Sequence, residues 1–508
     1  MRFVLSSLGV VVRKPFQCLL HCWVVLLPVL GGMTLLACDD SDRFTVNRGA
    51  VLRFLSDTIR FDTVLTTIPS STRMLTVYNR NKNGLRIQRV WMERMKDSPY
   101  QVNVDGISLS PAQEAYDFEV RGGDSLMVFV KVLLPETGQD EPLVNNDRLM
   151  IQLESGVVQS VVLTATAQDS YMWRGKIIHS DTTLCSGRPF VIYDSLVVAP
   201  DITLTLERGV QLYFHDKANL LVYGRLDVRG VRDSMVVFRG DRTDRLFDYL
   251  PYDNTPSRWG GIRLFAESTG NRFCGADIHS ATFGIACDSS SVDEEKLRLE
   301  NSVLHNIGGD GLSVLGNRIR VTNTQISNTL GHCVSVVGGD VEFLHCTLAQ
   351  FYPWEALRGK ALYLANQRFN MSYPLYKAHF LNCIITGYSD DVIQGSIDDE
   401  EDNVDYLFDH CLLNTVKSDD MRRFVGIVYE ADEKDKDTCA REKNFFLFDT
   451  KNFLYDFRLD SCSVARNIGD MKWALQLPDD PYGVSRVSDE GPDAGCYEYV
   501  PRKIEEKQ

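Results

Sequence analysis

Four charged residues in the C-terminal half of the chain could carry acid–base chemistry. Arg358 and Lys360 lie close together, and Asp390 and Asp391 follow further along. A carboxylate that takes up a proton, beside a cation that stabilises a developing negative charge, can support cleavage of a polysaccharide. These four residues are therefore the candidate catalytic groups of a polysaccharide lyase or a glycoside hydrolase.

Five acidic residues in a row follow these candidates. They are Asp398, Asp399, Glu400, Glu401 and Asp402. Carboxylate oxygens are the ligands that Ca²⁺ prefers, so the run is a candidate calcium-binding loop. A run of like charges is also typical of a solvated loop, which needs no ion. We expect no cofactor, with calcium as the alternative.

Three aromatic residues lie near the candidate cations in the sequence: Tyr352, Trp354 and Tyr373. Aromatic rings offer flat apolar faces with a polar edge, on which sugar rings can stack. Packing of the same rings against the rest of the fold is the alternative. We therefore treat these three residues as candidates for binding a glycan.

A repeated pattern of six residues organises the region that holds these candidates. It reads apolar, any, Asn or His, Ser/Thr/Cys, any, aliphatic, and it occurs at 299–304, 321–326, 343–348, 380–385 and 408–413. Its third position is occupied by Asn301, Asn323, His345, Asn382 and His410. The steps between them are 22, 22, 37 and 28 residues, which is the signature of a solenoid with insertions at 351–374 and 386–406.

The small and the aliphatic residue of each repeat are two positions apart, which is the spacing of a β-strand. The Asn or His is expected at the bend between two strands, because Asn tolerates left-handed backbone angles. Stacked coils would then place these side chains in a ladder. The region resembles the right-handed parallel β-helices of the pectate-lyase-like fold.

Acidic side chains do not form a row along the repeats. The positions before the Asn or His are Glu300, Thr322, Leu344, Leu381 and Asp409, and the outward positions are Val303, Gln325, Thr347, Ile384 and Leu412. Six histidines are numerous for one domain, but two occupy the turn position and favour a structural role: His279, His305, His332, His345, His379 and His410. The missing carboxylate row favours a protein that is not an enzyme.

The first 37 residues contain three basic and no acidic residues, and an apolar run ends at Leu35-Leu36-Ala37-Cys38. This segment resembles a bacterial lipoprotein signal, in which Cys38 would be lipidated after cleavage. An uncleaved membrane anchor is the alternative. The acidic residues that follow resemble the surface-export signal of Bacteroidetes lipoproteins.

The segment 45–169 contains short strands separated by turn signals such as Asp105-Gly106 and Gly122-Gly123. It resembles the Ig-like domain that follows the tether in Bacteroidetes lipoproteins. The resemblance implies five segments: signal peptide 1–37, tether 38–44, Ig-like β-sandwich 45–169, right-handed parallel β-helix 170–500 and charged tail 501–508. The residues 455–459, 465–470 and 493–498 resemble the final coil and cap of that family.

The 508 residues carry a net charge of −15, and loss of residues 1–37 would make it −18. This sign argues against nucleic acid as a partner. Of 13 cysteines, ten follow Cys38 and show no C-x-x-C spacing, so a zinc or redox motif is not indicated and disulfide pairs cannot be assigned. Cys346, Cys383 and Cys411 share one inward repeat position and are expected to form a row of buried thiols.

These observations predict an all-β lipoprotein of the outer membrane, exposed at the cell surface and anchored through Cys38. Its β-helix is expected to bind a glycan or a protein partner without catalysis. A lyase or hydrolase acting from the inserted loops is one alternative, and a structural subunit of an outer-membrane protein complex is another. Retention on a glycan without cleavage would distinguish the binding protein from the enzyme.

Overall fold

The computed structural model describes residues 43–247, 249–398, 404–430, 441–488 and 490–501. The predicted signal peptide, the lipidation site Cys38 and residues 399–402 of the acidic run lie outside the described residues. Within these ranges, no helix has the length and apolar character needed to cross a membrane. Nearly all regular structure is β-strand, which confirms the predicted all-β class.

The described chain divides into two compact units. The first takes its residues from the segment up to Ile59, from 72–131 and from 147–163, and the second comprises 60–71, 132–146 and the chain from 164 onward. The division passes through four strands of the N-terminal sheets, so the sheets are described first and the coils that follow them second.

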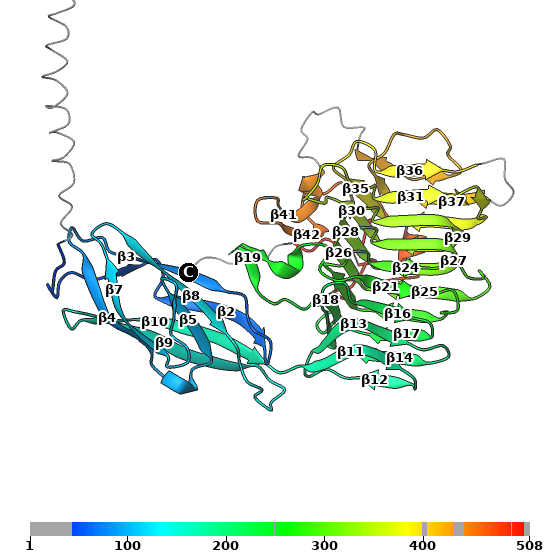
Figure 1. The fold of residues 1–508 in the computed structure, drawn as a ribbon. Helices are drawn as coiled ribbons and strands as arrows, with labels where there is room; N and C mark the ends of the chain where they lie inside the picture. The colour runs from blue at the N-terminus through cyan, green and yellow to red at the C-terminus, as the bar shows by residue number, and fades with distance from the viewer. Residues whose placement is uncertain (1–42, 248, 399–403, 431–440, 489, 502–508) are drawn as a thin grey trace, which may run out of the picture. The chain divides into compact units, whose positions relative to one another are not determined.

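Two five-stranded sheets form the N-terminal β-sandwich (Figure 1). The strands of the first sheet are, in spatial order, β1 (Arg53–Phe54), β3 (Arg73–Tyr78), β8 (Ser125–Val132), β5 (Tyr100–Val104) and β6 (Ile107–Ser108). Those of the second sheet are β2 (Thr58–Leu65), β10 (Val158–Gln168), β9 (Leu143–Leu153), β4 (Leu85–Met92) and β7 (Glu114–Val120). The pairs β3–β8 and β4–β9 run antiparallel. Exposed and buried side chains alternate along β8, as expected for a sheet that covers a core with one face.

The chain from β11 to β40 winds into a parallel β-helix, as predicted (Figure 1). Its 26 strands follow one another in chain order, and each pairs in parallel with a strand of a neighbouring coil. The strands are β11 (Tyr171–Ile178), β12 (Thr182–Leu184), β13 (Phe190–Val198), β14 (Thr203–Glu207), β15 (Gln211–Phe214), β16 (Asn219–Val222), β17 (Arg225–Arg229), β18 (Val236–Gly240), β21 (Gly261–Leu264), β22 (Asn271–Cys274), β23 (Ala276–His279), β24 (Ile285–Cys287), β25 (Glu295–Glu300), β26 (Val303–Ile307), β27 (Leu312–Thr322), β28 (Gln325–Thr329), β29 (Val334–Leu344), β30 (Thr347–Gln350), β31 (Leu362–Ala365), β34 (Leu375–Leu381), β35 (Ile384–Gly387), β36 (Ile393–Ser396), β37 (Val404–Asp409), β38 (Leu412–Leu413), β39 (Phe424–Val425) and β40 (Val428–Tyr429).

Short elements that do not belong to this sheet are inserted between its strands or follow its last strand. They are the hairpins β19 (Arg245–Phe247) with β20 (Leu250–Pro251), β32 (Gln367–Arg368) with β33 (Met371–Ser372) and β41 (Phe445–Asp449) with β42 (Leu454–Leu459), and the single turns η2 (Tyr252–Asn254), η4 (Glu442–Asn444) and α2 (Met471–Ala474). The turn η1 (Met95–Asp97) belongs to the sandwich region.

Each six-residue repeat spans the end of one strand, a bend and the start of the next strand. The Asn or His of all five repeats lies in the left-handed region, with φ between 48° and 53°. This conformation turns the chain from one face of the coil to the next, and Asn adopts it at less cost than other side chains. The segments 351–374 and 386–406 are not wholly loops, because β31 and β36 within them form the third side of their coils.

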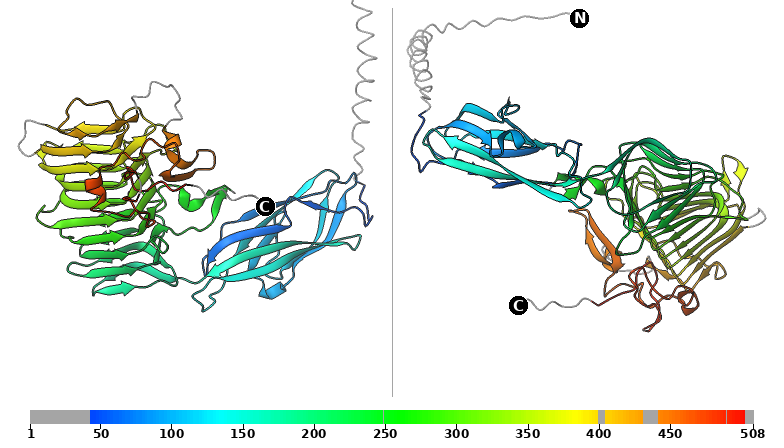
Figure 2. Two further views of the ribbon diagram at one scale, coloured as in Figure 1. Left: turned by 180° about the vertical axis from the view of Figure 1, so that it is seen from behind. Right: turned by 90° about the horizontal axis from the view of Figure 1, so that it is seen from below.

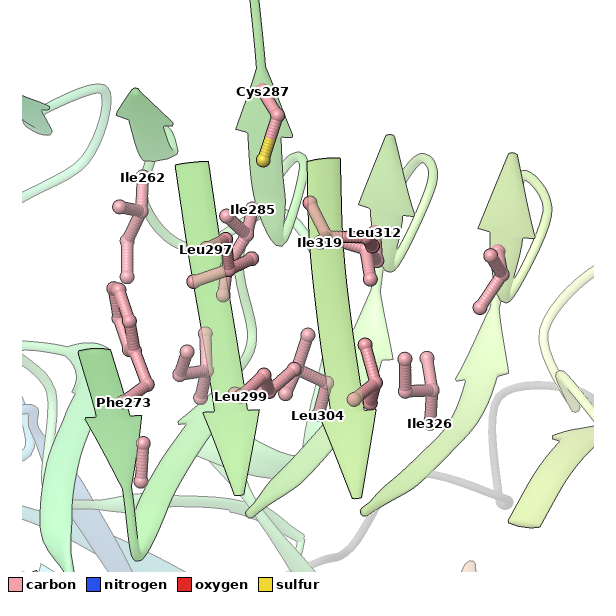
Figure 3. Packing of buried hydrophobic residues seen from close by; sticks show 14 of the residues in the cluster. Ile262, Phe273, Ile285, Cys287, Leu297, Leu299, Leu304, Leu312, Ile319 and Ile326 are labelled. Atoms are coloured by element: carbon pink, nitrogen blue, oxygen red, sulfur yellow. The ribbon is translucent and has the colours of Figure 1, made fainter. Parts of the chain in front are cut away.

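The interior of the coils is a continuous apolar core. Leu304 and Ile326 lie side by side in it, and one coil after another adds an aliphatic or aromatic side chain at the same level (Figure 3). Cys346, Cys383 and Cys411 are fully buried in this core as free thiols. Each coil therefore buries its apolar face only against its neighbours, as expected for a solenoid.

A second apolar cluster lies outside the coils. The outward residues Ile384 and Leu412 are fully buried because Phe445 and Phe457 of the β41–β42 hairpin cover them. The expected final coil and cap are therefore not found where predicted: residues 455–459 and 493–498 run along one side of the stack (Figure 2). The physical reason is that apolar outward positions need a cover.

Candidate functional site

The candidate cation Lys360 and the candidate carboxylate of Asp391 are both used to hold the coils together. The ammonium of Lys360 donates to the backbone carbonyl of Asp391 at 2.6 Å. The Asp391 carboxylate accepts hydrogen bonds from the Thr415 hydroxyl at 2.8 Å and from the backbone N–H of Ile393 at 3.1 Å. The cation therefore meets the backbone of Asp391 rather than its carboxylate.

The other two candidates, Arg358 and Asp390, contact other groups. The Arg358 guanidinium donates to the backbone carbonyl of Tyr352 and lies 4.7 Å from the ring centre of Tyr388. Asp390 is fully exposed and lies 3.3 Å from the guanidinium of Arg441. Among the described residues, no ion pair joins Arg358 or Lys360 to the carboxylate of Asp390 or Asp391.

The three candidate aromatic residues pack largely against the protein. Tyr352 is only 2% exposed, which leaves almost no ring face for a sugar. Trp354 stacks on Phe453 at 4.3 Å between ring centres. Tyr373 is partly buried, and its backbone N–H donates to the carbonyl of Asn366. Phe453, on which Trp354 stacks, lines the pocket described below.

Asp398 is the only residue of the acidic run that the structure describes. Its backbone N–H and C=O exchange hydrogen bonds with the side-chain amide of Asn366, at 2.9 and 2.8 Å. This contact anchors the start of the run on the third side of the coil. The remaining four acidic residues lie outside the described ranges.

Among the described residues, the turn side chains form two pairs of the predicted ladder rather than one continuous row. The Asn323 amide donates to Asn301 at 3.1 Å, and the Asn382 amide lies 3.1 Å from Nε2 of His345. Between these two pairs, the buried guanidinium of Arg486 donates to the side-chain oxygen of Asn323 at 2.8 Å. The residues that follow the β41–β42 hairpin, 460–488 and 490–501, are called the C-terminal segment. Arg486 holds this segment against the turn residues of the coils.

His345 is a neutral imidazole inside this ladder. Burial lowers its pKa well below the usual range, and the nearby guanidinium of Arg486 lowers it further. The unfolded chain takes up a proton near pH 6.5 whereas the folded chain does not, so stability present above this pH is lost as the pH falls.

We expect the substitution His345→Asn to reduce this acid sensitivity. Between about pH 6.5 and 5, the parent should lose up to about 1.4 kcal/mol of unfolding free energy per pH unit that the variant does not lose. Denaturant unfolding at a series of pH values measures this difference. His179→Asn is the control, because His179 is exposed. Parallel pH profiles for the parent and His345→Asn would contradict the prediction.

A concave pocket of about 350 Å³ lies over the strands β23, β26 and β28. The hairpin strand β42 and two tyrosines of the C-terminal segment form its other walls. Its lining residues are Arg232, Met235, Asn254, Asp277, Val303, His305, Asn306, Gln325, Ser327, Asn328, Phe453, Leu454, Tyr455, Asp456, Phe457, Tyr482 and Tyr497. We refer to it as the hairpin pocket.

An Asp–His–His cluster borders the hairpin pocket. Oδ1 of Asp277 lies 2.9 Å from Nδ1 of His279 and 3.3 Å from Nε2 of His305. The two imidazoles stack with 4.8 Å between ring centres. On the far side, Nε2 of His279 lies 3.6 Å from Asp253, which in turn pairs with Arg239 at 2.6 Å.

The electrostatics of the cluster favour the charged carboxylate. Burial opposes the charge on Asp277, but the imidazoles of His279 and His305 outweigh burial and hold the pKa of this carboxyl well below its usual range. Burial likewise opposes the charge on His279, and the carboxylates of Asp277 and Asp253 raise its pKa to about 9. The cluster is thus a compact concentration of charge at the pocket wall.

The parallel register explains how the cluster forms. Asp277 and His279 are two residues apart on β23 and share one face, and His305 is the register partner of His279 on β26. Asp277 is the register partner of Val303, which is the first of the five outward repeat positions. Asp277 therefore occupies the outward position of the preceding coil, and a search of the repeat extended to residues 276–279 would have detected this carboxylate and His279.

A second cluster contains Asp409, His410 and Asp470, but a cation is already present there. The ammonium of Lys472 lies 2.9 Å from Asp409 and 3.1 Å from Asp470. Asp409 also accepts the indole N–H of Trp473 at 2.9 Å and faces Nδ1 of His410 at 2.6 Å. This cluster attaches the C-terminal segment to the coils. His410, the last turn residue of the predicted ladder, contacts Asp409 in it.

Comparison with known proteins identifies no family. No family model matches the chain, and no curated protein matches it. A solved structure of a protein of unknown function from Porphyromonas gingivalis W83 is 13% identical over 26% of this chain and 60% of that one, with a TM-score of 0.18. The E. coli chaperone DraB is 16% identical over 23% of this chain and 55% of its own, with a TM-score of 0.16. This chain therefore spans less than two thirds of either structure.

A further match covers more of the chain. The catalytic unit of a GH87 alpha-1,3-glucanase from Streptomyces thermodiastaticus strain HF3-3 is 13% identical over 64% of this chain and 72% of its own, with a TM-score of 0.21. Likenesses of this strength carry no function to the present chain.

Proposed function

We propose that the β-helix binds a saccharide in the hairpin pocket without cleaving it. The observation that carries the proposal is the composition of the pocket wall. Aromatic rings from the hairpin and the C-terminal segment face a sheet surface that presents amide, hydroxyl, imidazole and carboxylate groups. Saccharides need both kinds of group, because their C–H faces stack on rings and their hydroxyls require hydrogen-bond partners.

Two tyrosines illustrate this arrangement. Tyr482 is 43% exposed, and its ring lies 4.2 Å from the guanidinium of Arg232 and 5.7 Å from the ring centre of Tyr497. The hydroxyl of Tyr497 donates to Gln325 at 3.0 Å. Tyr482 is thus a partly exposed ring in the pocket lining, and the guanidinium groups of Arg232 and Arg458, which lie 4.2 and 5.5 Å from its centre, hold it in place.

The carboxylates that line the hairpin pocket support binding more than cleavage. A glycoside hydrolase needs a carboxylic acid that donates a proton to the leaving group. The pKa of Asp277 is held far too low for this role at neutral pH, since the effect of its two imidazoles exceeds that of burial. Asp456 accepts paired hydrogen bonds from Arg458, at 3.0 and 2.5 Å. Both carboxylates therefore serve as charged acceptors.

We expect Tyr482→Ala to weaken saccharide binding by at least about tenfold, because a ring face that contacts the sugar is lost. Affinity electrophoresis on a panel of neutral and acidic polysaccharides, followed by calorimetry with the best oligosaccharide, measures the change. Tyr376→Ala is the matched control, since Tyr376 is similarly exposed but lies outside the pocket lining.

The same samples are assayed for new reducing or unsaturated ends. Retention without cleavage supports the proposal. Cleavage by the parent protein would refute the non-catalytic part of it, and equal affinities of the Tyr482→Ala and Tyr376→Ala variants would refute the assigned pocket. Absence of binding to every glycan would direct attention to a protein partner at the outer membrane.

The proposal also places the chain at the outer membrane, attached through lipid on Cys38. It is supported by the residues Leu35-Leu36-Ala37-Cys38 after an apolar run, with acidic residues following at once. Acyl chains attached to this cysteine would hold the protein on a membrane. A Cys38→Ser chain should lose both acyl labelling and membrane fractionation, and unchanged labelling would contradict the anchor.

A further inference from the structure

The cluster at the wall of the hairpin pocket has the donor set of a transition-metal site. Two imidazole nitrogens and one carboxylate oxygen, from His279, His305 and Asp277, lie within 4.8 Å of one another. Two of the three separations are 2.9 and 3.3 Å. Ligands that bind one ion at ~2.0–2.2 Å lie about 3 to 3.5 Å apart, so these separations match the edges of a coordination shell.

The elements that carry the donors are rigid. Asp277 and His279 extend from one strand, and His305 extends from the neighbouring strand in direct register. Both strands lie in the middle of the parallel stack, with fully buried neighbours such as Ile278 and Leu304 beneath them. The donors are therefore held in place by the sheet and do not depend on a loop to bring them together.

A supporting carboxylate stands behind the cluster. When Nδ1 of His279 faces the other two donors, its Nε2 faces Asp253 at 3.6 Å. Metal-binding histidines usually donate their second N–H to such a carboxylate, which orients the ring and makes it a better ligand. Arg239 fixes Asp253 from the opposite side at 2.6 Å.

In the part of the chain that the structure describes, no Lys or Arg side chain occupies the position between the three donors, and an ion bound there would displace the proton that joins His279 to Asp277. Among these residues, Asp277 forms ion pairs with His279 and His305 and with no Lys or Arg. The cluster at Asp409 differs, because Lys472 already supplies its charge. Asp277 and His305 also line the hairpin pocket, so an ion can enter from solvent and would present its remaining positions to the pocket.

We propose that Asp277, His279 and His305 bind one first-row divalent transition ion of the Zn²⁺ class. Imidazole ligands suit Zn²⁺ and its neighbours, whereas Ca²⁺ and Mg²⁺ prefer oxygen alone. The ion leaves coordination positions open to the pocket, where a hydroxyl or carboxylate of a bound molecule can reach it. This assignment goes beyond saccharide binding and does not depend on it.

The test uses the full chain, purified in detergent and stripped with EDTA, without any saccharide. Calorimetry with Zn²⁺, and visible absorption with Co²⁺ as a spectroscopic substitute, should show one saturable site per chain with a dissociation constant in the micromolar range or below. Ca²⁺ should not compete. Because no saccharide is present, failure here leaves the proposed function untouched, and failure of glycan binding leaves the metal site untouched.

Asp277→Asn and His305→Gln should each weaken Zn²⁺ binding at least tenfold and remove the Co²⁺ bands. His410→Gln, in the cluster that Lys472 already fills, should bind as the parent does. Thermal unfolding shows whether each variant is folded, and added Zn²⁺ should raise the midpoint of the parent but not of the two ligand variants. No saturable binding by the parent, or binding that both ligand variants retain in full, would overturn the proposal.

Discussion

Replacement of Arg486 by Met is expected to lower the free energy of unfolding by about 3–5 kcal/mol, the range for losing one partner of a buried, hydrogen-bonded ion pair. The side chain of Arg486 is fully buried. Its guanidinium donates to Glu498 at 2.5 Å, to Asn323 at 2.8 Å and to the carbonyl of Cys496 at 2.8 Å. Met fills similar volume but removes the guanidinium donor from all three acceptors, of which Glu498 keeps only the backbone N–H of Asp493 among the described donors to its Oε1.

The loss should be largest where the C-terminal segment lies on the coils. Denaturant unfolding gives the free energy, and limited proteolysis should cut the variant first within residues 441–501. Arg486→Lys keeps the charge but not the planar fork, so an intermediate loss is expected. Arg422→Met is the control, because its side chain is 91% exposed and its ion pair contributes little. A change below about 1 kcal/mol in Arg486→Met would contradict the assigned role.

Replacement of Phe380 by Ala is expected to cost about 3–5 kcal/mol of unfolding free energy. Phe380 is fully buried, and its ring stacks between Phe343 and Phe408 at 4.9 and 5.1 Å between ring centres. All three residues occupy the first position of the six-residue repeat. Truncating the middle ring leaves a cavity that the flanking rings, fixed by their strands, cannot fill.

Hydrogen exchange should show where this destabilisation acts. Each coil contacts only its neighbours, so protection should fall first in the strands β29, β34 and β37 that carry the three rings. Phe380→Leu should cost less, about 1.5 kcal/mol or below, because most of the volume is kept. Phe369→Ala serves as the control, since Phe369 is 82% exposed. Equal unfolding midpoints for Phe380→Ala and the control would rule out the stack as a stabilising feature.

The repeat pattern was sufficient to predict the coils. The small residue Cys383 and the aliphatic residue Ile385 are two positions apart, so both point to the same face of a strand, and that face must be buried. The same pattern recurs in each coil, so the coils must stack to bury it. The turn residue Asn382 adopts φ near 50° for the same local reason. These features depend on residues close together in the chain, so sequence alone carries them.

The strands within the inserted segments 351–374 and 386–406 were harder to predict, because β31 and β36 do not carry the six-residue repeat. Leu362–Ala365 pairs with β29 and β36 through backbone hydrogen bonds that any side chain allows. The candidates Lys360 and Asp391 precede β31 and β36, and the hydrogen bond between them joins two coils. Charged residues in an insertion look alike in sequence whether they bind a ligand or support the backbone.

The sequence by itself determined the all-β class, the stacked coils, the left-handed turns and the row of inward thiols, because each follows from side-chain spacing within a coil. Only the tertiary structure decided what lies outside the coils. It brought Tyr482 and Tyr497 against the sheet that carries Asp277, through contacts between residues far apart in the chain. It also brought His305 beside His279, since register between coils is a property of the stack. The pocket and the cluster at its wall have no local period, which is why they emerged only from the fold.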